Sequence, residues 1–117
     1  DGMAEVRAAA HEDINLITLL CSATGSGLQA MEIKGEWYKV PCNPRFIIVN
    51  TGDMLQMASG GYFPSTTHRV INPETNQKEQ SRMSMPLFLH PHGHIKLSKK
   101  YTAGDYLEER LKEIGLK

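Results

Sequence analysis

The chain has 117 residues, with thirteen Lys and Arg against thirteen Asp and Glu, and therefore no formal net charge. This length predicts a single domain covering residues 1–117, which is small for an enzyme that encloses a metal and two substrates. The balanced charge argues against nucleic acid as a partner and favours a small molecule.

The sequence shows no feature of a secreted or membrane protein. Cys21 and Cys42 are too few for a disulfide framework and indicate a reducing compartment, so we expect a cytoplasmic location. The longest apolar run, residues 14–21, is far too short to span a membrane, and the N-terminus lacks the layout of a signal peptide. The first residue is Asp1 rather than Met, which suggests a fragment or a processed product.

Seven β-rich runs follow one another, separated by short polar turns, at the spacing typical of an all-β sandwich or barrel. These runs are residues 6–11, 16–21, 28–33, 37–40, 46–50, 65–71 and 82–89. Residues 53–59 are expected to form a helical turn after Thr51-Gly52 breaks the preceding strand. The chain then ends in a helix predicted over about 102–115, with Thr102 as N-cap, Asp105 three residues later and Gly115 as its end. The sequence therefore predicts an all-β core over about 6–91 with one C-terminal helix.

His11 and Asp13 stand two residues apart at the end of the first predicted strand, so both side chains project to one side of an extended chain. His68 lies fifty-five residues after Asp13, in another β-rich run that a barrel can place opposite the first. Two imidazoles and one carboxylate form the facial triad of non-haem Fe(II) oxygenases, which leaves one face of the metal open for a cosubstrate and dioxygen. An HxD pair alone is common in proteins without a metal, and its ordinary interpretation is a strand-end pair without chemistry.

Arg82 and Ser84 fall on the same face of the last predicted strand, fourteen residues after His68. An arginine on the inner wall of a barrel is a costly unpaired charge unless its guanidinium receives a carboxylate bidentately, with the serine hydroxyl as a further donor. A dicarboxylate ligand meets that requirement. The alternative is a surface arginine paired with an acid such as Glu79.

Six short motifs follow one another in the chain: Ala10-His11-Glu12-Asp13, Gly27-Leu28-Gln29, Gly35-Glu36-Trp37, Val49-Asn50-Thr51-Gly52-Asp53, Ser65-Thr66-Thr67-His68-Arg69-Val70 and Arg82-Met83-Ser84-Met85-Pro86. With this combination, residues 6–91 resemble the C-terminal catalytic domain of the isopenicillin N synthase-like, plant-type family of 2-oxoglutarate and Fe(II)-dependent dioxygenases. The resemblance implies a double-stranded β-helix, or jelly roll. It also implies that His11, Asp13 and His68 bind iron, and that Arg82 and Ser84 bind the distal carboxylate of 2-oxoglutarate.

The same resemblance implies the reaction. Members of the family use Fe(II), 2-oxoglutarate and O2, with ascorbate as an optional reductant, to hydroxylate or otherwise oxidise a C–H bond of a small molecule, and they release succinate and CO2. They are usually much longer, with an N-terminal region whose tyrosine also holds 2-oxoglutarate, and no residue before His11 can supply that contact here. A missing strand leaves an unpaired sheet edge, so we expect the chain to form a homodimer, swap strands or bind its missing half.

Other prominent residues are assigned no chemistry. His90, His92 and His94 form an HxHxH pattern, but Pro91 and Gly93 interrupt the strand, which favours a solvated loop over a metal site. Asp53 is expected to cap the backbone that follows it, and Glu12 to point away from the two residues beside it. The aromatic and methionine side chains are expected to pack in the core or barrel wall, namely Trp37, Tyr38, Phe46, Phe63, Phe88, Met54, Met57, Met83 and Met85.

Three alternatives stay open. An iron oxidase of the same family would bind the metal without consuming 2-oxoglutarate, and a truncated, catalytically silent domain would serve as an interaction module. A cupin-like site would hold zinc or another divalent ion, although the carboxylate suits Fe(II) better. The motifs also leave the outcome open between hydroxylation, desaturation and ring closure.

Overall fold

The computed structural model describes residues 6–72 and 81–117. The elements in this part of the chain are β1 (Val6–His11), β2 (Ile17–Cys21), β3 (Leu28–Met31), β4 (Trp37–Lys39), β5 (Ile47–Thr51), α1 (Asp53–Ala58), β6 (His68–Ile71), β7 (Pro86–Leu89) and α2 (Ala103–Glu113). Each of the seven predicted strands is present, and both predicted helices are found. Most of the connection between the last two predicted strands, including the acid Glu79, falls in residues 73–80, outside the described part.

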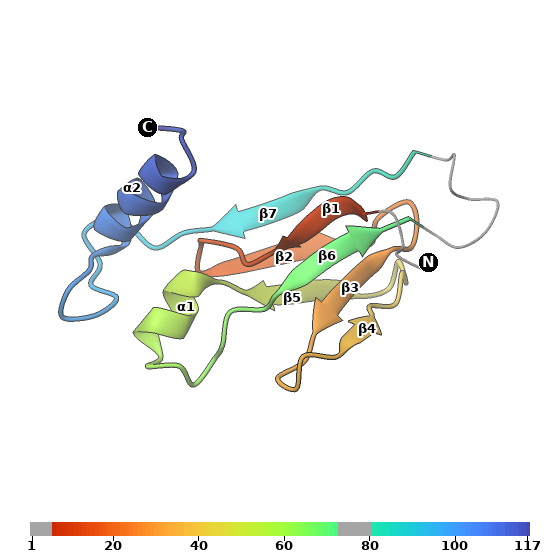
Figure 1. The fold of residues 1–117 in the computed structure, drawn as a ribbon, viewed down its shortest axis with the longest axis horizontal. Coiled ribbons are helices and arrows are strands. Elements are labelled where there is room, and N and C mark those ends of the chain that lie inside the picture. The colour runs from red at the N-terminus through yellow and green to blue at the C-terminus, as the bar shows by residue number, and fades with distance from the viewer. Residues whose placement is uncertain (1–5, 73–80) are drawn as a thin grey trace.

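The strands form two antiparallel sheets (Figure 1). One has the order β1-β6-β3-β4 and the other the order β5-β2-β7. The two sheets face each other, because Leu20 and Ile48 of the second sheet and Leu28 of the first line one common cavity. β1 and β6 are neighbours although most of the β-rich chain lies between them, so the fold brings His11 and His68 together.

Buried residues form two groups. The first contains Leu20 and Leu28, which line the cavity between the sheets, and Ala30, which lies on the same face of β3 as Leu28. The second joins both helices to the loop between β1 and β2, with Met54, Leu97 and Ala103 at its centre and Ile14, Leu16, Met57, Tyr106 and Leu107 packed around them. The loop that follows His11 therefore packs against both α1 and α2.

The C-terminal helix begins and ends as predicted. The Thr102 hydroxyl accepts a hydrogen bond from the Asp105 backbone N–H, and the Asp105 carboxylate accepts one from the Thr102 N–H, which together make a capping box. Gly115 follows the helix with a φ of 83°, a conformation that glycine adopts without strain. No helix within residues 6–72 and 81–117 is both long enough and apolar enough to cross a membrane.

Of the nine aromatic and methionine side chains expected in the core or barrel wall, six are exposed, although Tyr38 and Phe88 among them lie on strands. Met54 is buried, Met57 packs against it, and Trp37 lies partly buried beneath the Arg69 guanidinium, 3.9 Å from its ring centre. The exposed residues are Tyr38, Phe46, Phe63, Phe88, Met83 and Met85. The last strand also begins at Pro86 rather than at residue 82. An apolar pattern shows that a face can be buried, but it cannot show that another layer covers that face.

Candidate metal centre

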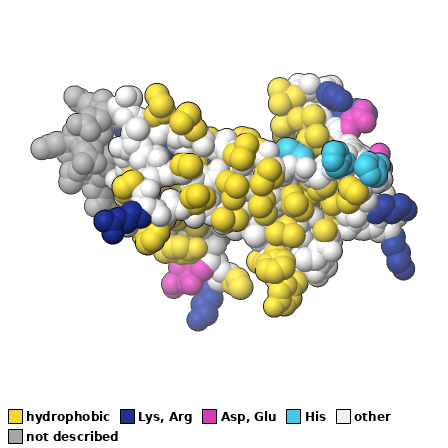
Figure 2. Space-filling model, turned by 180° about the vertical axis from the view of Figure 1, so that it is seen from behind, with side chains coloured by type: hydrophobic (Ala, Val, Ile, Leu, Met, Phe, Trp, Pro, Cys, Tyr) yellow, Lys and Arg dark blue, Asp and Glu magenta, His cyan; other side chains and the backbone are white. Residues whose placement is uncertain are grey.

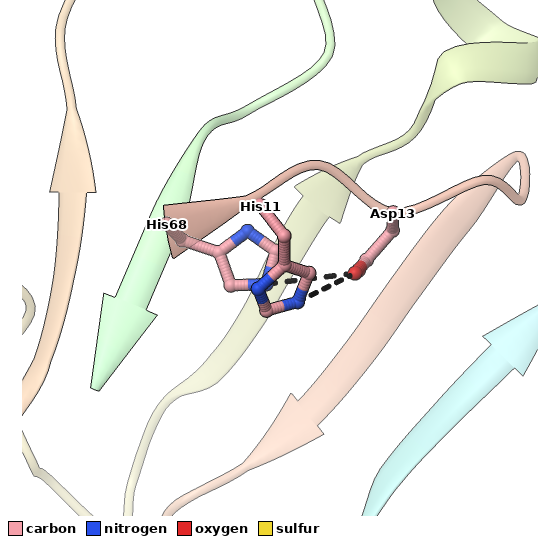
Figure 3. A group of neighbouring side chains, drawn as sticks. All are labelled: His11, Asp13 and His68. Atoms are coloured by element: carbon pink, nitrogen blue, oxygen red, sulfur yellow. Dashed lines mark ion pairs between the residues drawn. The ribbon is translucent and has the colours of Figure 1, made fainter. Parts of the chain in front are cut away.

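The three predicted metal ligands converge at one end of the β1-β6 pair. His11 and His68 are direct partners in the antiparallel register, so their side chains lie on the same face of the sheet. Their ring centres are 4.3 Å apart. Asp13 follows two residues after the last residue of β1, and the chain turns there so that its carboxylate faces both rings (Figure 3).

The distances suit one divalent ion. Nε2 of His11 and Nε2 of His68 each lie 3.5 Å from Oδ1 of Asp13, and the ligand atoms of the three residues all lie within 4.8 Å of one another. Nitrogen and oxygen donors bind such ions at about 2.0–2.2 Å, which places adjacent donors about 3 Å apart. Small side-chain movements would bring these donors to that spacing. No other group of three His, Cys, Asp or Glu residues in the described part of the chain meets the same criterion.

Backbone carbonyls fix both histidines in the orientation that a metal requires. Nδ1 of His11 lies 2.8 Å from the carbonyl oxygen of Ala9, and Nδ1 of His68 lies 2.9 Å from that of Thr66. A carbonyl oxygen only accepts, so each Nδ1 donates its N–H, and in the neutral imidazole each Nε2 then carries the lone pair that can bind a metal. The two rings therefore present their free nitrogens to the Asp13 carboxylate, as metal-binding imidazoles do.

A buried polar network orients the carboxylate in turn. The Thr18 hydroxyl donates to Oδ2 of Asp13 at 2.6 Å, and the Asn15 amide donates to Thr18 Oγ1 at 3.0 Å and to the Ile17 carbonyl at 2.9 Å. Asn15 and Thr18 are 2% and 3% exposed, and Asp13 is 9% exposed. With Oδ2 held by Thr18, Oδ1 is the oxygen left to face the histidines.

The start of α1 holds the backbone of the same loop. The N–H groups of Asp53 and Met54 donate to the carbonyls of Asp13 and Asn15, at 2.8 and 3.1 Å. Gly52 comes so close to this loop that a Cβ atom there would lie 2.1 Å from the Asn15 carbonyl oxygen. Gly52 is thus required by a close backbone approach that positions Asp13 and Asn15.

Arg82 lies between the two sheets, away from the triad. Its Nε donates to the carbonyl of Gly25 at 3.0 Å, and its side chain lines the small cavity that contains Leu20 and Leu28. Burial lowers the pKa of this guanidinium. Arg82 and Ser84 are half-buried while Met83 and Met85 are exposed, so the predicted shared face of Arg82 and Ser84 agrees with their burial, although they precede β7 rather than belong to it.

The separation of Arg82 from the triad can be followed along β6. His68 begins this strand, and the N–H of Ile71 at its other end donates to Gly27, two residues after the Gly25 carbonyl that Arg82 contacts. Three strand residues rise about 10 Å. Arg82 and the triad therefore lie near opposite ends of β6.

An open groove of about 300 Å³ adjoins the triad. His11 and Asp13 lie on one side of it, with Phe88 and His90 from the end of β7 and Leu107 from α2 among the other lining residues. Its lining is mainly apolar with a few polar groups, and a space of this size fits a small organic molecule. The exposed ring of Phe88 is thus explained as a groove wall rather than as core.

Comparison with known proteins identifies the family. The model of the 2OG-Fe(II) oxygenase superfamily matches residues 1–91. The chain belongs to this superfamily. Its double-stranded β-helix fold, predicted from the motifs, is confirmed by the solved structures that match it.

Three relatives show how much of an oxygenase this chain represents. Flavonol synthase/flavanone 3-hydroxylase of Petunia hybrida is 39% identical over 82 residues, which are 70% of this chain and 22% of the relative. A crystal structure from Shewanella oneidensis is 57% identical with a TM-score of 0.86, covering 98% of this chain and 42% of that one. A full-length Neurospora crassa protein in complex with alpha-KG is 27% identical with a TM-score of 0.82, covering 93% and 38%. The chain therefore spans less than half the length of each.

Two other expectations for this oxygenase chain can be compared with the structure. His90, His92 and His94 lie outside the strands and are exposed, as expected of a loop, and the rings of His92 and His94 stack 5.9 Å apart. The expectation that Asp53 caps the following backbone is wrong, because Gly52 is the N-cap and no side chain caps α1. Asp53 instead accepts a hydrogen bond from the Tyr106 hydroxyl at 2.8 Å and so ties α1 to α2.

The sequence interpretation missed two residues of the site. They are Asn15 and Thr18, the two polar residues within the apolar run 14–21, and they form the network behind Asp13. Glu12, as expected, points elsewhere and accepts a hydrogen bond from Thr67. The available signal was the pair of polar residues in a run that is otherwise apolar, because a buried polar group needs a nearby partner.

Proposed function

We propose that this chain carries the metal and cosubstrate sites of a non-haem Fe(II) and 2-oxoglutarate-dependent dioxygenase that oxidises a small molecule. In this proposal His11, Asp13 and His68 hold the iron, and Arg82 with Ser84 binds the distal carboxylate of 2-oxoglutarate. The observation that carries it is the convergence of two Nε2 atoms on one carboxylate oxygen. The other possible ligand atoms of the three side chains, the two Nδ1 atoms and Oδ2 of Asp13, form hydrogen bonds elsewhere.

The donor set fits Fe(II). Two neutral imidazoles and one carboxylate leave half of an octahedron open, which the family uses for 2-oxoglutarate and dioxygen. When bound, these groups supply the oxidative decarboxylation of 2-oxoglutarate to succinate and CO2, coupled to oxidation of a C–H bond. The protein's part is orientation: Thr18 holds the carboxylate, Ala9 and Thr66 hold the rings, and the groove beside His11 would place the substrate against the open side.

The half-buried arginine supports 2-oxoglutarate as the cosubstrate. A guanidinium between two sheets is stabilised by a carboxylate that meets its planar fork, and the lowered pKa of Arg82 reflects the desolvation that makes such a partner favourable. The Arg82-Ser84 pair is a modest argument against an iron oxidase of the same family that does not use 2-oxoglutarate. A catalytically silent domain is the stronger rival, because the chain covers 42% or less of the relatives described above.

Anaerobic titration with Fe(II), followed by 2-oxoglutarate and then oxygen, separates these functions. The wild-type chain is expected to bind Fe(II), and His68→Ala is expected to weaken binding more than about a hundredfold, because it removes a direct ligand. His94→Ala is the matched control, since that exposed imidazole lies outside the cluster. Succinate release after oxygen is added supports 2-oxoglutarate use. Iron binding without succinate favours the oxidase, and equal affinity in all three proteins contradicts the metal centre itself.

A further inference from the structure

Asp53, the first residue of α1, connects the C-terminal helix to the loop that carries Asp13. Its carboxylate oxygen Oδ2 accepts a hydrogen bond from the Tyr106 hydroxyl of α2 at 2.8 Å. Its backbone N–H donates to the Asp13 carbonyl, also at 2.8 Å. The same residue is therefore bonded to α2 through its side chain and to a proposed metal ligand through its backbone.

Apolar contacts join the same two parts of the molecule. Ile14, which follows Asp13 directly, and Leu107 of α2 pack against one buried cluster that contains Met54 and Ala103. Figure 2 shows the block that contains α2 at the upper right, with hydrophobic side chains on its inner side, towards the sheets, and charged side chains on its outer side. The apolar side of α2 is thus turned towards the triad loop.

The Tyr106 hydroxyl is suited to hold Asp53 in place. Tyr106 is half-buried, and burial, together with the Asp53 carboxylate beside it, raises the pKa of the hydroxyl, so that it keeps its proton and donates. A hydrogen bond from a hydroxyl to an ionised carboxylate is roughly twice as strong as one between neutral groups. The bond therefore restrains the residue whose N–H reaches Asp13.

We propose that Tyr106 and Asp53 are positioning residues of the metal centre. Their hydrogen bond holds the start of α1 against the triad loop, and this keeps the Asp13 carboxylate facing the two histidines. The inference rests on the proposed function, because it requires the triad to bind a metal. It also goes beyond the family match, since the superfamily model ends at residue 91 and α2 lies after it.

Anaerobic titration of the 117-residue chain with Co(II), at a temperature where circular dichroism shows every variant folded, tests the proposal. Tyr106→Phe is expected to lower metal affinity about threefold to tenfold, which is less than the loss of a group that contacts a ligand side chain directly. Thr102→Ala is the matched control, because it removes the capping box of the same helix and weakens α2 without removing the bond to Asp53. The control should bind Co(II) like the wild type.

The absorption bands of bound Co(II) give a second readout, which a loss of stability alone does not move. They report the geometry of the ligands, so Tyr106→Phe is expected to shift them and Thr102→Ala is not. Asp53→Asn keeps an oxygen acceptor for the Tyr106 hydroxyl and should retain most of the affinity, whereas Asp53→Ala should lose as much as Tyr106→Phe. The double variant Tyr106→Phe/Asp53→Ala should lose no more than either single variant, because both changes remove the same bond.

The possible failures can be told apart. If the wild type binds Co(II) through His68 but Tyr106→Phe keeps its affinity and its spectrum, the positioning role is overturned and the metal centre stands. Equal losses in Tyr106→Phe and Thr102→Ala, or additive losses in the double variant, also overturn the positioning role. A wild-type chain that binds neither Fe(II) nor Co(II) overturns the metal centre and the positioning role together.

Discussion

The hydroxyl of Thr18 can be removed without changing the shape of its side chain much, which tests whether the network behind Asp13 supports the metal centre. Thr18→Val replaces the hydroxyl by a methyl group at a position that is 3% exposed. The carboxylate oxygen Oδ2 then loses its donor, and the Asn15 amide loses one acceptor. We expect Asp13 to rotate more freely and to bind the metal less tightly, while the histidines keep their own backbone contacts.

The magnitude follows from the kind of hydrogen bond that is lost. The bond is short at 2.6 Å, buried, and made to an ionised acceptor, a class worth about 1.5–3 kcal/mol. At about 1.4 kcal/mol for each factor of ten, that range corresponds to a loss of roughly 10-fold to 150-fold in metal affinity. Groups that support a ligand from behind contribute about 10-fold to 100-fold in known metal sites, so the two estimates agree.

Anaerobic calorimetric titration with Fe(II), or with Co(II) as an air-stable substitute, measures this loss. Thr67→Val is the matched control, because Thr67 precedes His68 directly but its hydroxyl donates to Glu12 outside the triad. The control should bind metal like the wild type. If Thr18→Val also binds like the wild type, or if Thr67→Val loses as much affinity, Thr18 does not orient the carboxylate and the reasoning fails.

Three further changes test other parts of the structure. Gly52→Ala should destabilise the chain by about 1–3 kcal/mol in urea unfolding, because its Cβ would overlap the Asn15 carbonyl, whereas Gly93→Ala, with its nearest contact at 3.7 Å, should change stability by less than about 0.5 kcal/mol. Arg82→Lys should weaken 2-oxoglutarate binding about tenfold and leave Fe(II) affinity unchanged, because lysine cannot meet a carboxylate bidentately. Arg45→Lys, at an exposed position, should change neither 2-oxoglutarate binding nor Fe(II) affinity. Tyr106→Phe should lower stability by about 1 kcal/mol at neutral pH, through loss of the bond to Asp53. Burial, with the nearby Asp53 carboxylate, raises the pKa of Tyr106 in the folded chain. The stabilisation by the Tyr106 hydroxyl is therefore complete below the ordinary tyrosine pKa near 10 and is lost as the pH rises above it. Unfolding of the wild type and of Tyr106→Phe should show a smaller difference in stability near pH 11 than at pH 7.

The triad could be predicted from the sequence because its geometry depends on two simple facts. A spacing of two residues puts His11 and Asp13 on one side, and a motif of known order supplies His68 at the start of another strand. The pairing of β1 with β6 then places His68 beside His11. The long-range partner itself was not derivable from alternation alone, since any of the seven strands has the same period, and it came from the resemblance to a family.

The supporting contacts were less predictable. Thr18 donates a hydrogen bond to Asp13, and Asn15 donates one to Thr18. The loop between β1 and β2 sets the directions of these side chains, and no periodic pattern encodes such a loop. Asp53 shows the converse problem, because a carboxylate at a helix start normally caps it, and here the Tyr106 hydroxyl from α2 competes successfully. Tertiary packing decides both cases.

The metal centre and the groove beside it depend on different contacts. The proposed metal donors are brought together by the pairing of β1 with β6, and they are oriented by residues close to them in the chain and by the N–H groups at the start of α1, all of which this chain contains. The groove beside them is open, and its described walls are Phe88, His90 and Leu107 opposite the triad loop. Metal affinity should therefore survive in the isolated chain even where substrate oxidation is slow, because orienting a ligand needs only local contacts whereas excluding water from a substrate needs an enclosed cavity. We therefore expect the isolated chain to form succinate in the presence of iron even when no substrate is added. If succinate forms only after a substrate is added, the groove closes more completely than its open shape implies.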